Sequence, residues 1–100
     1  MHTVDLLEEA IGLVERAGYR VRQEWLDGGD GGGCEIRGQK WVFIDLALGP
    51  ADQLEQVLEA LRHEPAAATL PMSAELTGLT RRTRQSVGGH SVLRRFPYPQ

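Results

Sequence analysis

The sequence contains a single cysteine, few aromatic residues and no long hydrophobic run. Cys34 alone cannot form a disulfide within the chain. No apolar stretch approaches the roughly 20 residues that a helix needs to cross a bilayer. The first residues lack the basic region with which a secretory signal begins. These absences favour a cytoplasmic protein with no membrane partner, and this is the localisation that we predict.

Charge is divided unevenly along the 100 residues. Residues 1–64 contain six lysines and arginines against thirteen aspartates and glutamates, which gives a formal charge of −7. Residues 65–100 contain five arginines and one glutamate, which gives +4. We therefore predict one acidic domain over 1–64, followed by a linker and a basic tail over 65–100. A short helix over 73–84, capped by Ser73, is expected within this partly disordered tail.

Alternating apolar and polar residues predict a β-hairpin over 33–46, and the rest of the chain can be arranged around it. Gly38 and Gln39 suit the centre of the turn, since glycine accepts a positive φ angle. Cross-strand pairing in this register places four apolar residues on one face of the sheet. These are Cys34, Ile36, Trp41 and Phe43. The opposite face would carry Val42 and Ile44 among charged residues.

Two helices are predicted from apolar residues that recur at i, i+3, i+4 and i+7. The first covers about 4–17, and the second begins at Pro50 and ends before Pro65, which cannot continue a helix. The apolar stripes consist of Leu7, Ala10, Ile11 and Val14 in the first helix and Leu54, Val57, Leu58 and Leu61 in the second. Each helix therefore has one surface to bury.

The order helix, strand, strand, strand, helix predicts an α+β domain. We expect a three-stranded antiparallel meander with both helices on one face, because the sheet and each helix offer one apolar surface. A first strand over 19–26 would add Tyr19, Val21 and Trp25 to the face that carries Trp41. With no basic residue expected on that face, the two tryptophans are predicted to pack in the core and not to form a stacking platform for a ligand.

This order of elements resembles the double-stranded-RNA-binding domain over residues 3–64. That family carries a lysine-rich cluster at the start of its last helix, whereas residues 49–55 here read Gly-Pro-Ala-Asp-Gln-Leu-Glu and contain no cation. The resemblance therefore implies a topology, and no RNA-binding residue is carried over. Residues 31–40, Gly-Gly-Gly-Cys-Glu-Ile-Arg-Gly-Gln-Lys, also resemble small uncharacterised bacterial proteins with a Gly-Gly-Cys hairpin, and this similarity implies no known activity.

No pattern in the sequence predicts a catalytic centre, a metal site or a cofactor. The glycine-rich segment 27–33, expected to be a loose connection, lacks the spacing of a dinucleotide-binding loop, and its two aspartates supply too few oxygens for calcium. An enzyme that uses Cys34 as a nucleophile or Asp45 as a buried acid remains an alternative. We favour a buried structural thiol for Cys34, and for Asp45 hydrogen bonds to the backbone near the start of the second helix.

The sequence favours a non-enzymatic protein-interaction module. Val42 and Ile44, together with Arg37 and Lys40 on the same sheet face, are the predicted docking residues for an unknown protein or a second copy of the chain. The alternative function is contact with nucleic acid through the arginines of the tail, which attract phosphate by charge. These are Arg81, Arg82, Arg84, Arg94 and Arg95.

Overall fold

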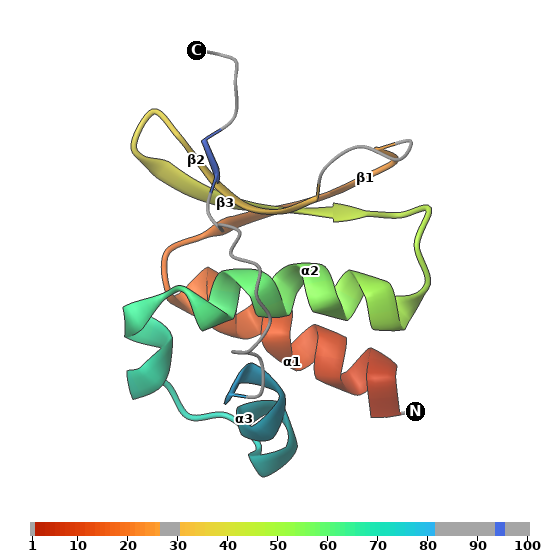
Figure 1. Ribbon diagram of the computed structural model, residues 1–100, viewed down its shortest axis with the longest axis vertical. Helices are drawn as coiled ribbons and strands as arrows, with labels where there is room; N and C mark the ends of the chain where they lie inside the picture. The colour runs from red at the N-terminus through yellow and green to blue at the C-terminus, as the bar shows by residue number, and fades with distance from the viewer. Residues whose placement is uncertain (1, 27–30, 82–93, 96–100) are drawn as a thin grey trace.

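The structure, a computed structural model, describes residues 2–26 and 31–81 and the backbone of 94–95 (Figure 1). The elements in chain order are α1 (His2–Arg16), β1 (Arg20–Glu24), β2 (Gly32–Ile36), β3 (Gln39–Asp45), α2 (Pro50–Arg62), the 3₁₀ helix η1 (Pro65–Thr69), α3 (Ala74–Arg81) and β4 (Arg94–Arg95). The predicted α+β class is therefore confirmed. Among the described residues, no helix is long and apolar enough to span a bilayer.

The helices lie together on one side of the sheet (Figure 1). α1 and α2 pack against each other beneath the strands, and α3 contacts α2 on the side remote from the sheet. The amphipathic stripes explain this arrangement, because a helix with one apolar surface buries it against the sheet and its neighbour. All four stripe residues of α2 are buried, as predicted.

The sheet is mixed, which corrects the predicted antiparallel meander. Its strand order is β1-β3-β2-β4, with β1 parallel to β3, β2 antiparallel to β3, and β4 parallel to β2. β1 therefore lies beside β3 and not beside β2, the strand that follows it in the sequence. Residues 25–31 join β1 to β2. This connection is longer than a tight hairpin and long enough to bridge two strand spacings of about 4.8 Å each.

The hairpin between β2 and β3 turns one residue earlier than predicted. Ile36 pairs with Gln39, so the central turn residues are Arg37 and Gly38. Their φ angles are both positive, 52° and 82°, which is the pattern of a type I′ turn, whose twist matches that of the flanking strands. The pairing of the strands thereby shifts by two residues, one full side-chain period, and the set of residues on each face stays as predicted.

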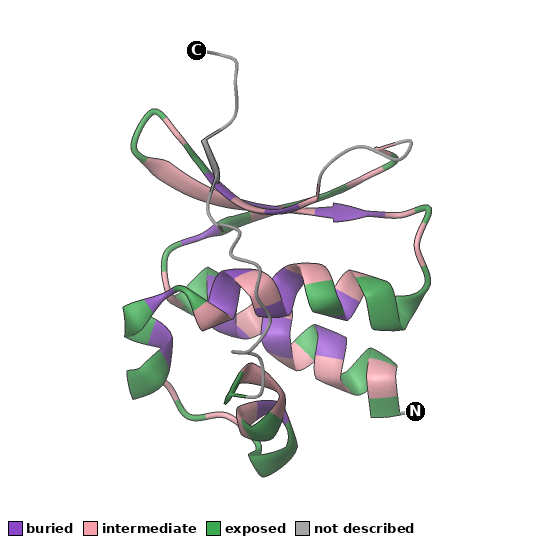
Figure 2. Ribbon diagram, viewed as in Figure 1, coloured by how far each residue is buried: buried purple, intermediate pink, exposed green. Residues whose placement is uncertain are grey.

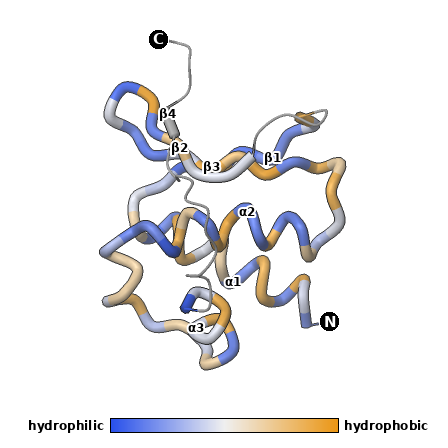
Figure 3. Tube along the Cα trace, viewed as in Figure 1, coloured by the Kyte–Doolittle hydropathy of each residue, from blue (hydrophilic) through white to orange (hydrophobic). Residues whose placement is uncertain are grey.

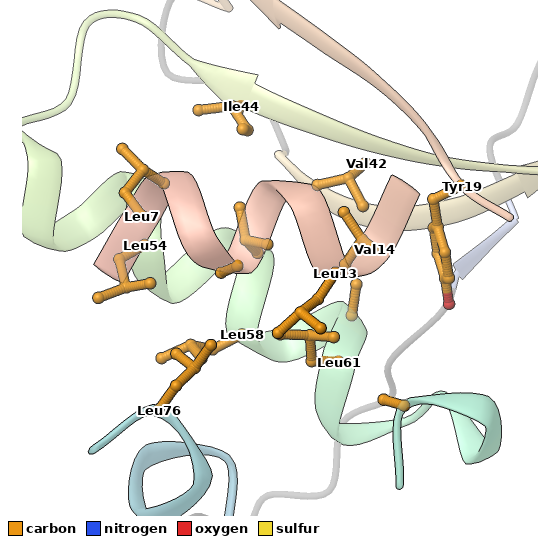
Figure 4. Close-up of a cluster of buried hydrophobic side chains, with 14 residues drawn as sticks. Leu7, Leu13, Val14, Tyr19, Val42, Ile44, Leu54, Leu58, Leu61 and Leu76 are labelled. Atoms are coloured by element: carbon orange, nitrogen blue, oxygen red, sulfur yellow. The ribbon is translucent and has the colours of Figure 1, made fainter. Parts of the chain in front are cut away.

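The helices cover the face of the sheet opposite to the predicted one. Val42 and Ile44 are 0% exposed and lie against α1 and α2, whereas Trp41 and Phe43 lie on the other face and are half-buried. Figure 4 shows Val42 and Ile44 above the helices, within the cluster of buried side chains. The prediction that these two residues form a docking pair at the surface is therefore wrong.

Pairing with β1 explains which face is covered. In the parallel register Val21 lies beside Val42, and Arg20 lies beside Trp41. Arg22 follows on the same face as Arg20, since side chains alternate along a strand. Burying these arginines without partners would cost several kcal/mol each, so the charged face of β1 turns away from the helices. Val21 consequently faces the core, opposite to Trp41, which corrects the prediction that the two share a face.

The hydrophobic core lies between the sheet and the helices (Figures 2 and 4). The apolar positions of α1 and α2 recur along both helices (Figure 3). The buried cluster consists of Leu7, Ala10, Leu13, Val14, Tyr19, Val42, Ile44, Leu54, Val57, Leu58, Ala60, Leu61, Ala67 and Leu76. Leu76 belongs to α3, whose predicted cap is present, because the N–H of Leu76 donates to Oγ of Ser73 at 3.1 Å. Packing against the core thus continues beyond residue 64.

Two residues of the glycine-rich segment allow α2 to lie close to the sheet. Gly32 has a φ angle of +99°, and a Cβ there would lie 2.9 Å from Oε1 of Glu59. A Cβ on Gly31 would collide with the side chain of Gln56. Glycine is therefore needed at both positions. The predicted loose connection is an ordered part of β2 at Gly32, while residues 27–30 lie outside the described residues.

Candidate interaction surface

The face of the sheet turned away from the helices carries aromatic and charged side chains together. We call it the outer face and define it by seven residues, Arg20, Arg22, Glu24, Cys34, Ile36, Trp41 and Phe43. They alternate along each strand with the residues that face the core, and the register of β1, β2 and β3 places them side by side. The outer face is therefore a product of tertiary pairing and not of one sequence motif.

Trp41 and Phe43 form a stacked pair on the outer face. Their ring centroids lie 5.7 Å apart and their planes differ by 9°. Cζ of Arg20, on the neighbouring strand, lies 5.7 Å from the centroid of the Trp41 ring, within the range of a cation–π interaction. A basic residue thus does share the face of Trp41, contrary to the prediction. The three side chains form one cluster across β1 and β3.

An ion pair adds charge to the same face. Arg22 and Glu24, two residues apart on β1, form a salt bridge in which the side chains are 55% and 40% exposed. An exposed pair of this kind contributes little to stability. With Arg20 counted, the outer face carries two guanidinium groups and one exposed carboxylate. It therefore combines aromatic rings with a small excess of positive charge.

Asp45 holds together the segments that follow two parallel strands. Its Oδ1 accepts hydrogen bonds from the backbone N–H of Leu26 at 3.1 Å and of Ala47 at 2.9 Å. Its own N–H donates to Oε1 of Gln56 on α2 at 2.9 Å. The side chain is buried, and its partners tie the ends of β1 and β3 to the helix layer. The predicted structural role, with backbone hydrogen bonds close to the start of α2, is confirmed.

Cys34 is a buried thiol on β2, opposite Trp41 in the strand register, and its predicted burial is confirmed. Nε2 of His2 lies 3.1 Å from the carboxylate of Glu75. His63 is exposed at the end of α2, and His90 lies outside the described residues. Among the residues that the structure describes, no three histidine, cysteine or acidic side chains are grouped as they would be around a metal ion.

A second polar cluster joins Tyr19, Lys40 and Glu64 beside the core. Nζ of Lys40 lies 2.6 Å from Oε1 of Glu64 and 5.4 Å from the centroid of the Tyr19 ring. Burial opposes the ionisation of Glu64, but the hydrogen bonds from Lys40 and from the N–H of Ala66 outweigh it and lower its pKa. Burial, and then the charge of Glu64, raise the pKa of Tyr19. The Tyr19 hydroxyl lies near the carboxylate of Glu64, which interacts with it, but it meets no described residue in hydrogen-bond geometry.

A cavity of about 380 Å³ opens where α2, η1 and α3 meet. Its lining includes Arg62, which is already engaged, because Nη1 lies 3.3 Å from Oε1 of Glu55 and Nη2 donates to the carbonyl of Leu79 at 3.1 Å. The hydrogen bond to Leu79 fastens α3 to α2. The remaining lining consists of Leu61, His63, Glu64, Pro65, Ala67, Ala68, Met72, Thr80 and Arg81. No nucleophile is paired with a base in this part of the chain.

The residues predicted to form the docking site are separated in the structure. Val42 and Ile44 lie in the core, and Lys40 contacts Glu64. Arg37 remains exposed, in the turn between β2 and β3. Sequence reasoning missed the outer face because it placed β1 beside the wrong strand. The signal that could have revealed the outer face is the row of charged residues on one side of β1. Whichever strand pairs with β1 must place its own alternate side chains on that same solvent-facing side.

The arginines of the tail lie largely beyond what the structure describes. Arg81 is exposed at the end of α3. Arg82 and Arg84 lie outside the described residues. The backbone of Arg94 and Arg95 forms β4, which pairs with the edge of β2. Two of the five predicted nucleic-acid contacts are thereby placed next to the sheet, at the level of the backbone.

Comparison with protein-family models, with curated proteins and with solved structures found no match for the chain. The proposed relation to proteins with a Gly-Gly-Cys hairpin stays a prediction. The likeness to the double-stranded-RNA-binding domain also stays untested by these comparisons, although the parallel pairing of β1 with β3 departs from the antiparallel meander on which it was based. Function must therefore be argued from the described surface itself.

Proposed function

We propose that this chain is a non-enzymatic protein-interaction module that binds its partner through the outer face. The observation that carries the proposal is the cluster of Trp41, Phe43 and Arg20 on the sheet face opposite the helices. Tryptophan and arginine are the residue types most enriched among those that dominate the energy of protein interfaces. Aromatic rings supply contact area at a low entropic cost, and the guanidinium group adds directional hydrogen bonds.

The composition of the core supports the same proposal. The buried cluster on the helix side is complete with aliphatic residues and Tyr19, and it uses neither Trp41 nor Phe43. Two large rings are thus held half-buried on the opposite face, where stability of the core does not require them. Their arginine neighbours favour a partner segment that offers both apolar side chains and carboxylates, because complementary charge guides specific association.

Affinity capture with matched variants tests this proposal. The full chain, Trp41→Ala and Arg20→Ala would be compared with Arg16→Ala, which removes an exposed arginine from α1, a helix of the layer that covers the opposite face of the sheet. We expect Trp41→Ala and Arg20→Ala to lose the same bound proteins and Arg16→Ala to retain them. Thermal denaturation controls for folding. Identical capture by all four proteins would contradict a role for the outer face.

A second candidate function, contact with single-stranded nucleic acid, has one specific observation in its favour. β4 brings the backbone of Arg94 and Arg95 to the edge of the sheet that carries the Trp41–Phe43 stack. Bases stack on aromatic side chains, and nearby cations attract the phosphates. Fluorescence anisotropy with a labelled oligonucleotide should show binding that weakens steeply with salt and is lost in Arg94→Ala/Arg95→Ala. Absent or salt-insensitive binding would eliminate this candidate.

The enzymatic alternative stays a prediction with a cheap test. Titration of the folded protein with a thiol reagent at neutral pH would report whether Cys34 is reactive. We expect slow modification, because the side chain is 1% exposed. Rapid modification of the folded chain would favour the nucleophile. The hydrogen bonds of Asp45 to two backbone N–H groups favour a structural carboxylate over a proton donor.

A further inference from the structure

β1 forms one edge of the sheet. Within the described part of the chain, its one strand partner is β3. The N–H of Leu46 donates to the carbonyl of Glu24 at 2.9 Å, so the backbone of Glu24 is directed at β3. Backbone groups alternate in direction along a strand, and those of Val21, Gln23 and Trp25 therefore point to the open side. An edge of this kind can accept a further strand.

Trp25 lies immediately after β1 and is 72% exposed. It shares its side of the strand with Val21, which is half-buried at the margin of the core. The indole of Trp25 is largely exposed beside the open edge of β1. It presents apolar surface that the rest of the described chain does not cover. The edge of β1 therefore has an apolar side, which carries Val21 and Trp25, and a charged side, which carries Arg22 and Glu24.

From this arrangement we propose that two copies of the chain associate through their β1 strands, antiparallel to each other, about a twofold axis at Gln23. Arg22 then lies opposite Glu24 of the second copy, and Val21 lies opposite Trp25 of the second copy. Both pairs occur twice by symmetry. The two sheets become one continuous sheet, and each exposed Trp25 is covered by the other copy.

The charges of β1 select this register among the symmetric alternatives. An axis at Arg22 also pairs Arg20 with Glu24 of the second copy, but it places Arg22 opposite its own copy, and an axis at Glu24 places that carboxylate opposite its own copy. An axis at Val21 places Arg20 opposite Arg22. An axis at Gln23 creates no like-charge pair and two opposite-charge pairs, which stabilise a sheet where like charges destabilise it. The sequence Arg-Val-Arg-Gln-Glu is thus complementary to itself in one alignment.

The occupant of the edge is therefore a second copy and not an unrelated peptide. In the antiparallel register Arg22 and Glu24 form a pair without mutual backbone hydrogen bonds, at which the side chains approach most closely. They already form a salt bridge within one copy, so both side chains are oriented on the outer face. This inference goes beyond the proposed function, since the dimer uses the edge of β1 and leaves Trp41 and Phe43 to the partner.

Charge reversal provides a decisive test with the full chain. Sedimentation velocity over a concentration series should show a species of twice 11.1 kDa. Arg22→Glu and Glu24→Arg each place like charges opposite each other twice, and each should weaken the dimer at least about tenfold. An equimolar mixture of the two variants restores both opposite-charge pairs and should dimerise again. Arg81→Glu and Glu8→Arg, at exposed positions on α3 and α1, are the matched controls and should leave the dimer intact.

Fluorescence gives an independent readout. The sequence contains two tryptophans, so Trp41→Phe leaves Trp25 as the reporter, and its emission should shift to shorter wavelength as the dimer forms. A monomer at every concentration overturns the proposal. A dimer that survives both charge reversals also overturns it, since the interface must then lie elsewhere. So does a mixture that stays monomeric. Circular dichroism of each variant shows that loss of the dimer is not loss of the fold.

Discussion

The two faces of the sheet differ in what their side chains do, although alternate residues of the same strand supply both. On β3, Val42 and Ile44 are fully buried against the helices, while Trp41 and Phe43 stack on the outer face beside Arg20. The smaller β-branched residues fill the narrow space under the sheet, and the larger rings are left outside. Hydrophobicity alone therefore does not identify the core face. The residues that cannot be buried, on the neighbouring strand, decide it.

Replacing the same residue type on each face measures this difference directly. Ile44 is completely buried among aliphatic side chains, and Ile36 is half-buried on the outer face. Ile44→Ala should lower the free energy of unfolding by about 3 kcal/mol, because it removes buried methyl groups and leaves a cavity. Ile36→Ala should lower it by about 1 kcal/mol, because less apolar area is returned to water. Urea denaturation of both variants and of the unchanged chain gives the two values.

Equal losses in the two isoleucine variants would mean that the outer face is as much a core as the other. A larger loss at Ile36 would reverse the assignment of the faces. The slope of the unfolding curve against urea should stay constant, so that the midpoint alone reports stability. A changed slope would point to an altered denatured state and would make the comparison between the faces unsafe.

The sequence allowed the local elements to be predicted well because their signals are local. α2 begins at Pro50 and ends before Pro65, and its stripe at i, i+3, i+4 and i+7 is buried in full. The existence of β2 and β3 follows from the alternation around Gly38 in the same way. Strand pairing has no such local signal. β1 pairs with β3 and not with β2 through contacts between residues about twenty positions apart in the chain, such as Arg20 beside Trp41.

The outer face could not be predicted from the sequence for the same reason. Arg20 lies beside Trp41 only if β1 and β3 are parallel neighbours, so the cation–π contact could not be predicted from a meander. The Tyr19, Lys40 and Glu64 cluster is equally non-local, since it joins the start of β1, the hairpin and the end of α2. By contrast, the burial of Cys34 and the backbone hydrogen bonds of Asp45 were predicted correctly, although alternation puts both residues on the side of Trp41 and Phe43, which the helices do not cover.

The ion pair between Lys40 and Glu64, beside the core on the helix-covered side of the sheet, should make the free energy of unfolding depend on pH. The pKa of Glu64 is lowered below 4.5 in the folded chain, against the effect of burial, because Lys40 and the N–H of Ala66 bind the carboxylate. A lowered pKa favours folding while the group is ionised. The contribution, about 1 kcal/mol after allowance for the partial exposure of Lys40, is therefore present above pH 4.5 and is lost as the pH falls through the folded-state pKa.

Glu64→Gln isolates this contribution from that of other acids. The difference in unfolding free energy between the unchanged chain and Glu64→Gln should be largest near neutral pH and should shrink below pH 4.5. Glu8→Gln is the control, because it removes an exposed carboxylate from α1. A difference that stays constant with pH would show that Glu64 acts through packing alone and not through its charge.

Tyr19→Phe should have the smallest effect, and its sign separates packing from hydrogen bonding on the helix-covered face. The ring is buried and lies 5.4 Å from Nζ of Lys40, and phenylalanine preserves both the packing and the aromatic face. The hydroxyl that it removes is buried and meets no described residue in hydrogen-bond geometry. Removal of an unsatisfied polar group should leave stability unchanged or raise it by up to about 1 kcal/mol.

A decrease in stability of more than about 1 kcal/mol in urea denaturation would instead mean that the Tyr19 hydroxyl is hydrogen-bonded, with the carboxylate of Glu64 as its acceptor. Tyr19→Leu, which deletes the ring as well, should be clearly less stable than Tyr19→Phe, because the core on this face depends on filled volume.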